Sequence, residues 1–329
     1  MIDPSEGVRR ALNEYTGRLP GVPLLIGCSG GPDSLALVHL ALQARDEAAL
    51  APIHVGVVDH QLQPGSAQVA QRAIEAAKSL GADECHLLTV TVDIHGQGIE
   101  AAARSARREA LAECARRIGA FEVWLGHTLD DQAETVLLGL ARGSGARSLA
   151  GMPDNDGMWA RPLLRSRRTD VHACLPADTA AWADPHNEDP RFLRPRVRHD
   201  LMPVLEAVLG ERAVEGLART ADLLRADDIA LRRMAATFAG EVLIEATDNQ
   251  VVFDRSSLRG GPSALRQRVL REALVRLGSP ASELTSRHYA RIDAALGGRG
   301  TVGPLAMPGA VEVLAESDRL TVRKQHGHS

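Results

Sequence analysis

A short segment near the start of the chain combines residue types that suit the binding of phosphate. It follows an apolar run, VPLLIGC, that begins at Val22, and it precedes a stretch with helical spacing. Two glycines allow the backbone to approach an anion closely, and the N–H groups at a helix N-terminus attract negative charge. The segment lacks the glycine spacing and the lysine of a Walker A loop. Its residues are Ser29, Gly30, Gly31, Pro32, Asp33 and Ser34.

We interpret this segment as a pyrophosphate-binding loop, because strand, glycines, carboxylate, hydroxyl and helix follow one another in the required order. The alternative is a glycine-rich turn in which Asp33 or Ser34 merely caps the helix.

Two acids near the middle of the chain have the spacing of a cation site. Asp131 and Glu134 are three residues apart and follow an apolar run that ends at Leu125. We expect both on one face of the first turn of a helix, where two carboxylates outweigh the helix's roughly half unit of positive charge. The pair predicts a seat for an ammonium group. The alternative is a capping-box-like pattern with no ligand.

His127 lies just before this pair, at the end of the same predicted strand. It could stack on or hydrogen-bond a reacting group, or it could be a structural histidine with satisfied hydrogen bonds.

Arginines account for most of the positive charge. Arg104 and Arg108 are four residues apart on one face of a predicted helix, which suits an anion, although a solvated helix surface is the alternative. Residues 191–198 carry four arginines and no acid, a composition that suits contacts with nucleic-acid phosphates. Aromatic residues make up only 3% of the chain, so we do not expect an aromatic platform that stacks RNA bases.

The elements that must position these residues alternate between strand and helix in the first half of the chain. This alternation predicts an α/β fold with a doubly wound, mostly parallel sheet. Ligands bind such sheets at the carboxyl ends of the strands, where the segments above lie. The predicted strands are Val22–Cys28, Ile53–Val58, Glu84–Val92 and Phe121–Leu125, and the predicted helices are Asp33–Ala44, Ser66–Leu80, Ile99–Ile118 and Asp130–Ala141.

The pattern changes after Arg142. Glycine-rich and proline-rich loops precede helical stretches from Arg198 to about Ala239 and from Ala264 to Leu277, and residues 303–324 alternate around a turn. We therefore predict a second, smaller, mainly helical domain that ends in a β-hairpin. The predicted domains are residues 1–210 and 211–329.

Composition bounds the class of protein. A chain of 329 residues, 44% hydrophobic and 24% charged, is typical of a folded two-domain protein. No apolar run approaches the ~20 residues of a membrane span, and the first residues lack an apolar signal core, so we expect a cytoplasmic protein. The net charge of −4 means that any nucleic acid must bind through local patches. The four cysteines form no C-x-x-C pair, which argues against a zinc knuckle or a disulfide framework.

Motifs along the chain resemble those of one family. Loop 29–34 resembles the S-G-G-x-D-S signature of the PP-loop ATP pyrophosphatase superfamily, which has an adenine nucleotide α-hydrolase-like fold. Seven further motifs resemble, in order, those of the tRNA(Ile)-lysidine synthases within that superfamily. They are V-D-H at 58–60, the arginine-bearing helix at 99–108, G-H-T-L-D-D-Q-A-E-T at 126–135, R-G-S-G at 142–145, R-P-L-L at 161–164, D-P-H-N at 184–187 and R-V-R-H at 196–199.

The resemblance is dense over residues 22–210 and weaker beyond them, and it indicates a short form of the family. Thr128-Leu129 follows His127 where many members have another histidine. His186 stands where serine is usual, and Pro195 stands where asparagine is usual.

The resemblance implies a reaction and its substrates. Such enzymes use ATP and Mg²⁺ to adenylate the C2 oxygen of cytidine 34 in the CAU anticodon of tRNA(Ile). Free L-lysine then attacks C2 and releases AMP. The implied partners are tRNA(Ile), L-lysine and ATP, without a membrane, and a homodimer is one open option.

The resemblance also implies residue roles. Loop 29–34 would bind the triphosphate, Asp59 would lie beside the adenine, and Asp33 would hold Mg²⁺. Arg104 would contact the α-phosphate, and His127 would face a reacting group. Asp131 and Glu134 would seat lysine, and Arg198 would lie near the reactive base.

The residues leave two alternative functions open. A tRNA thiolase of the same superfamily would share the loop but would need reactive or cluster-binding cysteines. A non-catalytic nucleotide-binding protein would not turn ATP over in response to tRNA.

Overall fold

The computed structural model describes residues 21–48, 52–63, 65–93, 98–143, 145–182, 189 and 191–325. The chain divides into two compact units, Met1–Arg225 and Ala226–Ser329, and each is described by itself. The division falls inside helix α10 (Ala213–Val242), beyond the predicted boundary at residues 210 and 211. The reason is that Val214, near the start of α10, packs into a core of the first unit.

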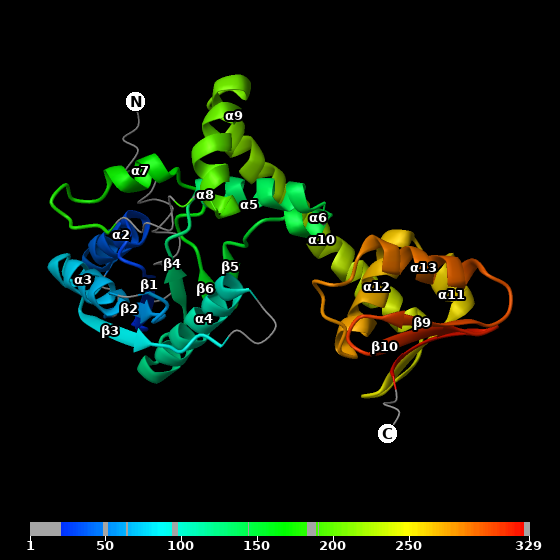
Figure 1. Cartoon of the computed structure of the whole chain (residues 1–329). Helices are drawn as coiled ribbons and strands as arrows, with labels where there is room; N and C mark the ends of the chain where they lie inside the picture. The colour runs from blue at the N-terminus through cyan, green and yellow to red at the C-terminus, as the bar shows by residue number, and fades with distance from the viewer. Residues whose placement is uncertain are drawn as a thin grey trace. The chain divides into compact units, whose positions relative to one another are not determined.

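The first unit contains the predicted doubly wound sheet (Figure 1). Its strand order is β3-β2-β1-β4-β6-β5, and every pair is parallel except β5 with β6. The mostly parallel α/β fold is thereby confirmed. The strands are β1 (Leu24–Cys28), β2 (Ile53–Asp59), β3 (Glu84–Thr89), β4 (Val123–Leu125), β5 (Asn155–Asp156) and β6 (Trp159–Ala160).

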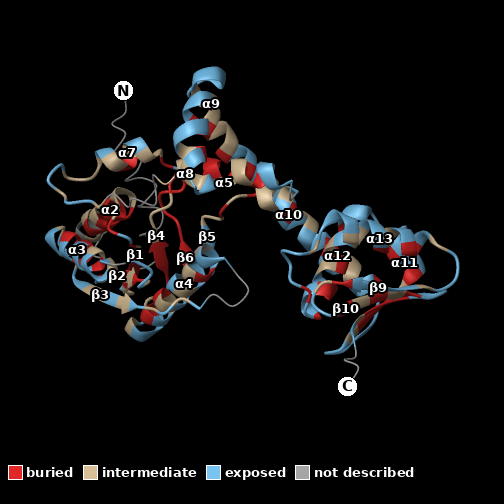
Figure 2. Cartoon of the chain, in the orientation of Figure 1, coloured by how far each residue is buried: buried red, intermediate tan, exposed pale blue. Residues whose placement is uncertain are grey.

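Helices cover both faces of this sheet, because alternate residues of each strand point to opposite sides. Ile26 and Trp124 pack with helices α2 (Pro32–Ala48) and α3 (Ser66–Ser79) on one face. Leu25 and Val123 pack with α4 (Ile99–Ile118) on the other. Figure 2 shows buried residues running along the central strands and the inner sides of these helices.

The order of the strands reverses between β1 and β4, so the sheet has its topological switch point there. Residues 29–34 and 126–131 follow these two strands and span each loop and the first residues of helix α2 or α5. Gly126 makes their close approach feasible, since a Cβ atom at this position would lie 2.9 Å from the carbonyl oxygen of Asp33. Gly30 has φ +81°, a conformation that L side chains rarely adopt.

The remaining helices of the first unit follow β4 and β6. They include a π-helical turn at Val197–Leu201, between α8 and α9. Ala133, Val197, Met202 and Val214 form a small core that joins α5, α9 and α10. The helices are α5 (Leu129–Arg142), α6 (Ala146–Leu149), α7 (Arg168–Ala173), α8 (Leu193–Arg196) and α9 (Met202–Leu209).

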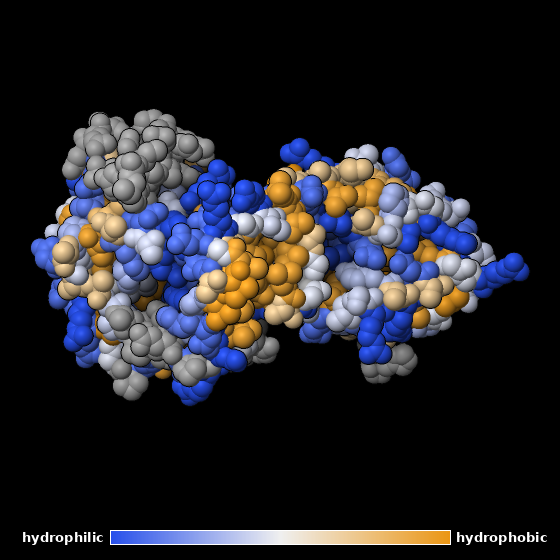
Figure 3. All heavy atoms as spheres, turned by 90° about the horizontal axis from the view of Figure 1, so that it is seen from above, coloured by the Kyte–Doolittle hydropathy of each residue, from blue (hydrophilic) through white to orange (hydrophobic). Residues whose placement is uncertain are grey.

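The helix predicted from Arg198 to Ala239 is two helices, because Gly210, with φ +92°, ends α9 before α10 begins. Helix α9 exposes Val204, Val208 and Leu209, and Figure 3 shows apolar side chains gathered on this face of the molecule. Exposed apolar patches often mark contact surfaces for other macromolecules.

The second unit packs helices against an antiparallel sheet of order β7-β8-β11-β10-β9. The predicted terminal hairpin is part of this larger sheet, which the sequence reading did not foresee. Its elements are β7 (Leu243–Ala246), β8 (Gln250–Asp254), α11 (Arg255–Gly260), α12 (Ser263–Arg276), α13 (Ser286–Gly297), β9 (Val302–Met307), β10 (Val311–Ala315) and β11 (Arg319–Lys324). Among the described residues of both units, no helix has the length and apolar character needed to cross a membrane.

Candidate active site

Loop 29–34 is shaped by the hydroxyl of Ser34. This hydroxyl donates a hydrogen bond to the carbonyl oxygen of Gly31 at 2.9 Å and accepts one from the N–H of Ser29 at 3.2 Å. The carbonyl oxygen of Gly30 accepts from the N–H of Trp182 at 2.9 Å. Pro32 then begins α2, whose first N–H groups have no partner within the helix. The loop therefore presents backbone donors at a helix N-terminus, as a phosphate site requires.

The carboxylate of Asp33 is held by two side chains of helix α7, an imidazole and a guanidinium. Its Oδ1 lies 2.7 Å from Nε2 of His172, and its Oδ2 lies 3.6 Å from Nε of Arg168. The side chain of Asp33 remains 26% exposed. It is thus fixed in direction but accessible at the mouth of the loop.

Asp131 takes part in the start of helix α5. Thr128 is the N-cap residue, and Oδ2 of Asp131 accepts from the N–H of Thr128 at 2.8 Å and from its hydroxyl at 3.0 Å. These contacts form a capping box between Thr128 and Asp131. The capping alternative therefore applies to Asp131, with Thr128 as its partner, and does not include Glu134.

Three arginines converge on Asp131 and Glu134. Oδ1 of Asp131 lies 3.0 to 3.1 Å from an Nη2 atom of each of Arg168, Arg194 and Arg198. Glu134 lies 3.1 Å from Arg168, 2.9 Å from Arg194 and 2.7 Å from Arg198. The two acid side chains are 8% and 1% exposed. The expected ammonium seat is therefore filled with guanidinium groups in this structure.

Both carboxylates are ionised. Burial alone would raise the pKa of Asp131, but Arg168 and Arg194 hold it well below its usual range. Burial likewise opposes ionisation of Glu134, and the hydrogen bond from Arg198 brings its pKa below the usual value. The cluster combines two negative with three positive groups, so it attracts an anion, and a cation binds there only by displacing a guanidinium group.

His127 lies beside this cluster as a neutral imidazole. Burial lowers the pKa of His127 from 6.5 to about 3, with Asp131 opposing the shift and Arg161, Arg194 and Arg104 adding to it. Its Nδ1 atom is buried and has no hydrogen-bonding partner among the described residues. A buried polar atom without a partner is a natural contact for a ligand.

Arg104 and Arg108 share a helix but not an environment. Arg104 is exposed, and its charge contributes to the lowered pKa of His127. Arg108 lies over the ring of Trp159, 4.5 Å from its centroid, and 3.8 Å from Asp156. Arg108 thus has a structural role that does not depend on a ligand.

Asp59 lies at the end of β2, on the same sheet edge as loop 29–34. Its side chain is buried and accepts the N–H of Gln61 at 3.0 Å. His60 follows, and its Nε2 accepts from Nε of Arg107 on α4 at 3.2 Å. Nδ1 of His60 is a second buried atom that has no partner in the described part of the chain.

The arginines of residues 191–198 divide into two pairs. Arg194 and Arg198 point to the buried acids, whereas Arg191 pairs with Asp189 at 2.6 Å and Arg196 lies 3.9 Å from Asp200. The segment itself holds no acid, but its sequence neighbours supply two. Motif residues 184–187 and Ser144 lie outside the described residues.

Sequence reasoning missed Arg168 and His172. They are four residues apart on α7, so they share one face and join Asp33 to the pair on α5. The four-residue spacing of Arg168 and His172 could have indicated a shared helix face. Arg168 ends the run RSRR, however, and such a run is typical of a solvated surface.

Known proteins resemble this chain over most of its length. Residues 4–205 match the model of the PP-loop domain. A tRNA(Ile)-lysidine synthase from Leifsonia xyli is 46% identical over 305 residues, covering 92% of this chain and 90% of the relative. One from Mycobacterium bovis is 48% identical over 269 residues, covering 82% and 79%. The chain belongs to the tRNA(Ile)-lysidine synthase family.

Membership in the tRNA(Ile)-lysidine synthase family makes the chain an enzyme, a ligase that uses ATP. A solved U34-tRNA thiolase from Methanococcus maripaludis has the same fold. It aligns with a TM-score of 0.57 and 17% identity over 67% of this chain and 79% of its own. At that identity the likeness concerns the fold alone.

The residues at loop 29–34 fit Mg²⁺, the metal that the tRNA(Ile)-lysidine synthase family implies. Mg²⁺ takes oxygen ligands and is commonly held by one or two carboxylates together with substrate phosphates and water. Asp33 offers one accessible carboxylate beside the backbone donors of the PP-loop.

Proposed function

We propose that the protein joins L-lysine to C2 of cytidine 34 in the CAU anticodon of tRNA(Ile), through an adenylated cytidine. ATP is cleaved to AMP and pyrophosphate. Three features support this proposal, and they lie around one switch point of the sheet. They are the PP-loop (residues 29–34), His127, and the acid–arginine cluster, which consists of Asp131, Glu134, Arg168, Arg194 and Arg198.

The PP-loop and Asp59 bind ATP in this proposal. The loop and the N-terminus of α2 hold the β- and γ-phosphates, and Pro32 fixes the start of the helix. Gly30 and Gly31 let the backbone approach the phosphates, and Ser29 and Ser34 exchange their mutual hydrogen bond for bonds to the ligand. Asp59, at the end of the strand β2 that pairs with β1, lies beside the adenosine part. Asp33, once released from His172, would hold Mg²⁺, which would supply positive charge against the leaving pyrophosphate.

Adenylation needs a cation at the α-phosphate and a neutral contact at the base. Arg104, whose charge contributes to the lowered pKa of His127, supplies the cation, which stabilises charge as the α-phosphate is attacked. His127 is uncharged at neutral pH, so its Nδ1 forms a hydrogen bond to a reacting group and does not serve as a proton donor in its charged form. The C2 oxygen forms the new bond to phosphorus, and pyrophosphate leaves.

The acid–arginine cluster binds lysine in the second step. Lysine carries an ammonium and a carboxylate, and the cluster offers carboxylates and guanidinium groups. The ammonium takes the place of one guanidinium at Asp131 and Glu134, and the displaced arginine pairs with the carboxylate of lysine or with the tRNA. The other amino group, deprotonated, attacks C2. AMP leaves with the C2 oxygen.

Arg198 lies at the boundary between the lysine and RNA sites. It contacts Glu134 from the segment that carries Arg191 and Arg196, whose side chains are 82% and 59% exposed. In the proposal, these exposed arginines exchange their acidic partners for tRNA phosphates, and Arg198 turns toward cytidine 34.

The thiolase alternative finds less support in the cysteines. All four described cysteines are free. Burial raises the pKa of Cys28, Cys85 and Cys114, which keeps their thiols protonated and poorly nucleophilic.

Pyrophosphate release tests the proposal. The adenylated group is the base, so release should require ATP and the tRNA together, and lysine should not be needed for it. Exchange of labelled pyrophosphate into ATP with lysine and without tRNA would show that the amino acid is activated instead, and would contradict the proposal.

A further inference from the structure

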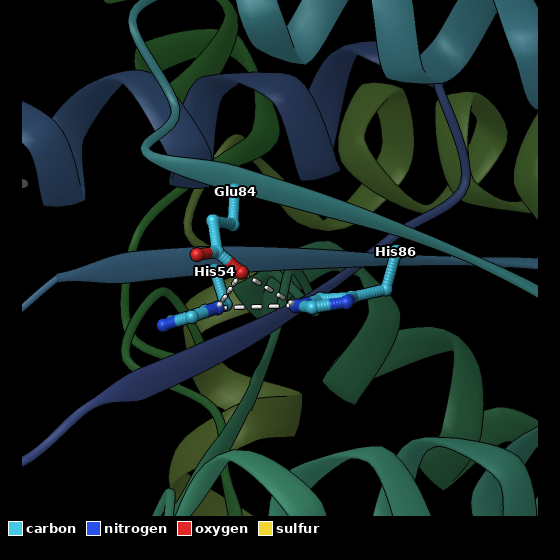
Figure 4. A group of neighbouring side chains, drawn as sticks. All are labelled: His54, Glu84 and His86. Atoms are coloured by element: carbon cyan, nitrogen blue, oxygen red, sulfur yellow. Dashed lines mark hydrogen bonds and ion pairs between the residues drawn. The ribbon is translucent and has the colours of Figure 1, made fainter.

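Two histidines and a glutamate meet on adjacent strands, on the side of the sheet that faces α4 (Figure 4). His54 lies on β2, and Glu84 and His86 lie on β3. The parallel register pairs His54 with Glu84 and Gly56 with His86, so all three side chains project from one face.

The three ligand atoms form a compact triangle. Nδ1 of His54 lies 3.0 Å from Nε2 of His86, and Oε2 of Glu84 lies 3.5 Å and 3.9 Å from these two nitrogens. The point equidistant from all three atoms lies about 2 Å from each, which is the length of a zinc–nitrogen or zinc–carboxylate bond. The two rings face each other across the hydrogen bond, with centroids 5.3 Å apart and 12° between their planes, so both must turn about their soft terminal torsions to direct their lone pairs to that point.

The environment suits a metal ligand set. The side chains of His54 and His86 are 11% and 17% exposed, whereas that of Glu84 is 65% exposed. The nitrogens are therefore shielded, and the open side allows an ion and water to enter. Burial, with His54 and Arg117, lowers the pKa of His86, which favours the neutral ring that binds metals.

We propose that His54, Glu84 and His86 form a binding site for one divalent transition metal of the zinc class. Two imidazoles and a carboxylate select Zn²⁺ and its neighbours over Mg²⁺, which prefers an all-oxygen set. His54 and Asp59 lie five residues apart on β2, about 16 Å along an extended strand. The site is therefore separate from the ATP site and its Mg²⁺.

The metal would replace the proton shared between the two imidazoles and join β3, the edge strand, to β2. The site would thus stabilise the sheet at its edge. Without metal, the same residues form only a hydrogen-bonded histidine pair next to a surface glutamate, and this is the alternative to be tested.

The test titrates Co²⁺ and Zn²⁺ into the metal-free full chain in the presence of excess Mg²⁺. All proteins carry His326→Ala and His328→Ala, because those histidines could bind metal independently and lie outside the described residues. We expect one equivalent of Co²⁺ to give visible d–d absorption bands that Zn²⁺ displaces, and Zn²⁺ to raise the melting temperature.

Glu84→Gln and His86→Gln, both at partly open positions, should each weaken Co²⁺ binding at least tenfold. Glu75→Gln, an exposed glutamate on α3, is the matched control and should bind as the parent does. Circular dichroism establishes that each variant is folded. The proposal is overturned if the parent binds no stoichiometric Co²⁺, or if Glu84→Gln and His86→Gln bind as tightly as Glu75→Gln.

Discussion

Asp131 and Glu134 have different structural roles, although both lie in the first turns of α5. Asp131 caps the helix with Thr128 and also contacts the arginines, whereas the contacts of Glu134 within the described part of the chain are with arginines. The three-residue spacing predicted their proximity correctly. It did not predict the three guanidinium groups, because these come from α7 and α8 and the following turn, more than 30 residues away in sequence.

Glu134→Gln should separate lysine binding from adenylation. The change keeps the size of the side chain but removes the charge that would attract the ammonium. We expect the KM for lysine to rise at least ~10-fold, the scale of about 1.4 kcal/mol, while tRNA-dependent pyrophosphate release stays within a factor of three.

Thr128→Ala is the matched control for helix capping. It should lower the free energy of unfolding by about 1 kcal/mol and leave the KM for lysine unchanged. If Glu134→Gln behaves like Thr128→Ala, with a lower melting temperature and an unaltered KM, then Glu134 is a structural partner of the arginines and not a lysine ligand.

Asp33→Asn should slow adenylation at least ~100-fold, because losing the carboxylate removes about 3 kcal/mol of electrostatic stabilisation. His172→Gln removes the histidine partner of Asp33 but keeps the carboxylate, so its effect should be smaller. Single-turnover AMP formation with tRNA measures both. AMP formation by Asp33→Asn at the parent rate would remove Asp33 from the mechanism.

His127 makes folding stability depend on pH. Its pKa is about 3 in the folded protein and near 6.5 when unfolded, so the unfolded chain binds more protons between these values. The stability that the neutral His127 contributes to the folded state is complete above about pH 6.5 and is lost progressively as the pH falls from there toward about 3. Between pH 7 and pH 5 we expect a loss of about 2 kcal/mol that His127→Gln does not show. Urea unfolding at both pH values measures the difference, and equal pH dependence in the two proteins would contradict the assignment.

At the scale of elements, the sequence predicted what depends on local patterns. Helix α4 spans Ile99–Ile118 as predicted, and the predicted strands became β1 to β4 with shifted ends. Strands β7 and β8 were missed, since Leu243–Ala246 is exposed throughout and Val251 to Phe253 are buried in succession, so neither alternates. Periodicity also could not show that α10 passes from one unit into the other.

Arg255 is the element-scale residue whose loss should be most visible in the second unit. It is 5% exposed and donates to the carbonyl oxygens of Ala295 at 2.7 Å, Gly298 at 2.6 Å and Gly300 at 2.8 Å, as well as to Glu316. It thereby supplies hydrogen-bond donors to the carbonyl groups at the end of α13 and in the loop beyond it.

Arg255→Lys keeps the charge, but a lysine side chain cannot donate to all these acceptors. We therefore expect the free energy of unfolding to fall by about 3 kcal/mol. Arg259→Lys, exposed on the same helix, should change stability by no more than about 0.5 kcal/mol. All three tryptophans lie in the first unit, so the transition followed by circular dichroism should shift more than the one followed by tryptophan fluorescence. Equal stability of the two variants would refute this role.

At the scale of the whole molecule, each unit has its own core, and α10 contributes residues to both. The described parts of the proposed ATP and lysine sites lie within the first unit, where the resemblance to the family is dense. The boundary predicted between residues 210 and 211 lies at the end of α9. The structural division comes later, because the start of α10 packs against α5.

In the proposed reaction, the ATP site and the lysine site act one after the other on the same tRNA base. Incorporation of labelled L-lysine into tRNA(Ile) transcripts tests it most directly, with a CAU anticodon in one transcript and uridine in place of cytidine 34 in the other. We predict close to one lysine per CAU transcript, with an equal amount of AMP formed, and none in the uridine transcript. ATP cleavage without lysine incorporation, or equal incorporation into both transcripts, would contradict the account.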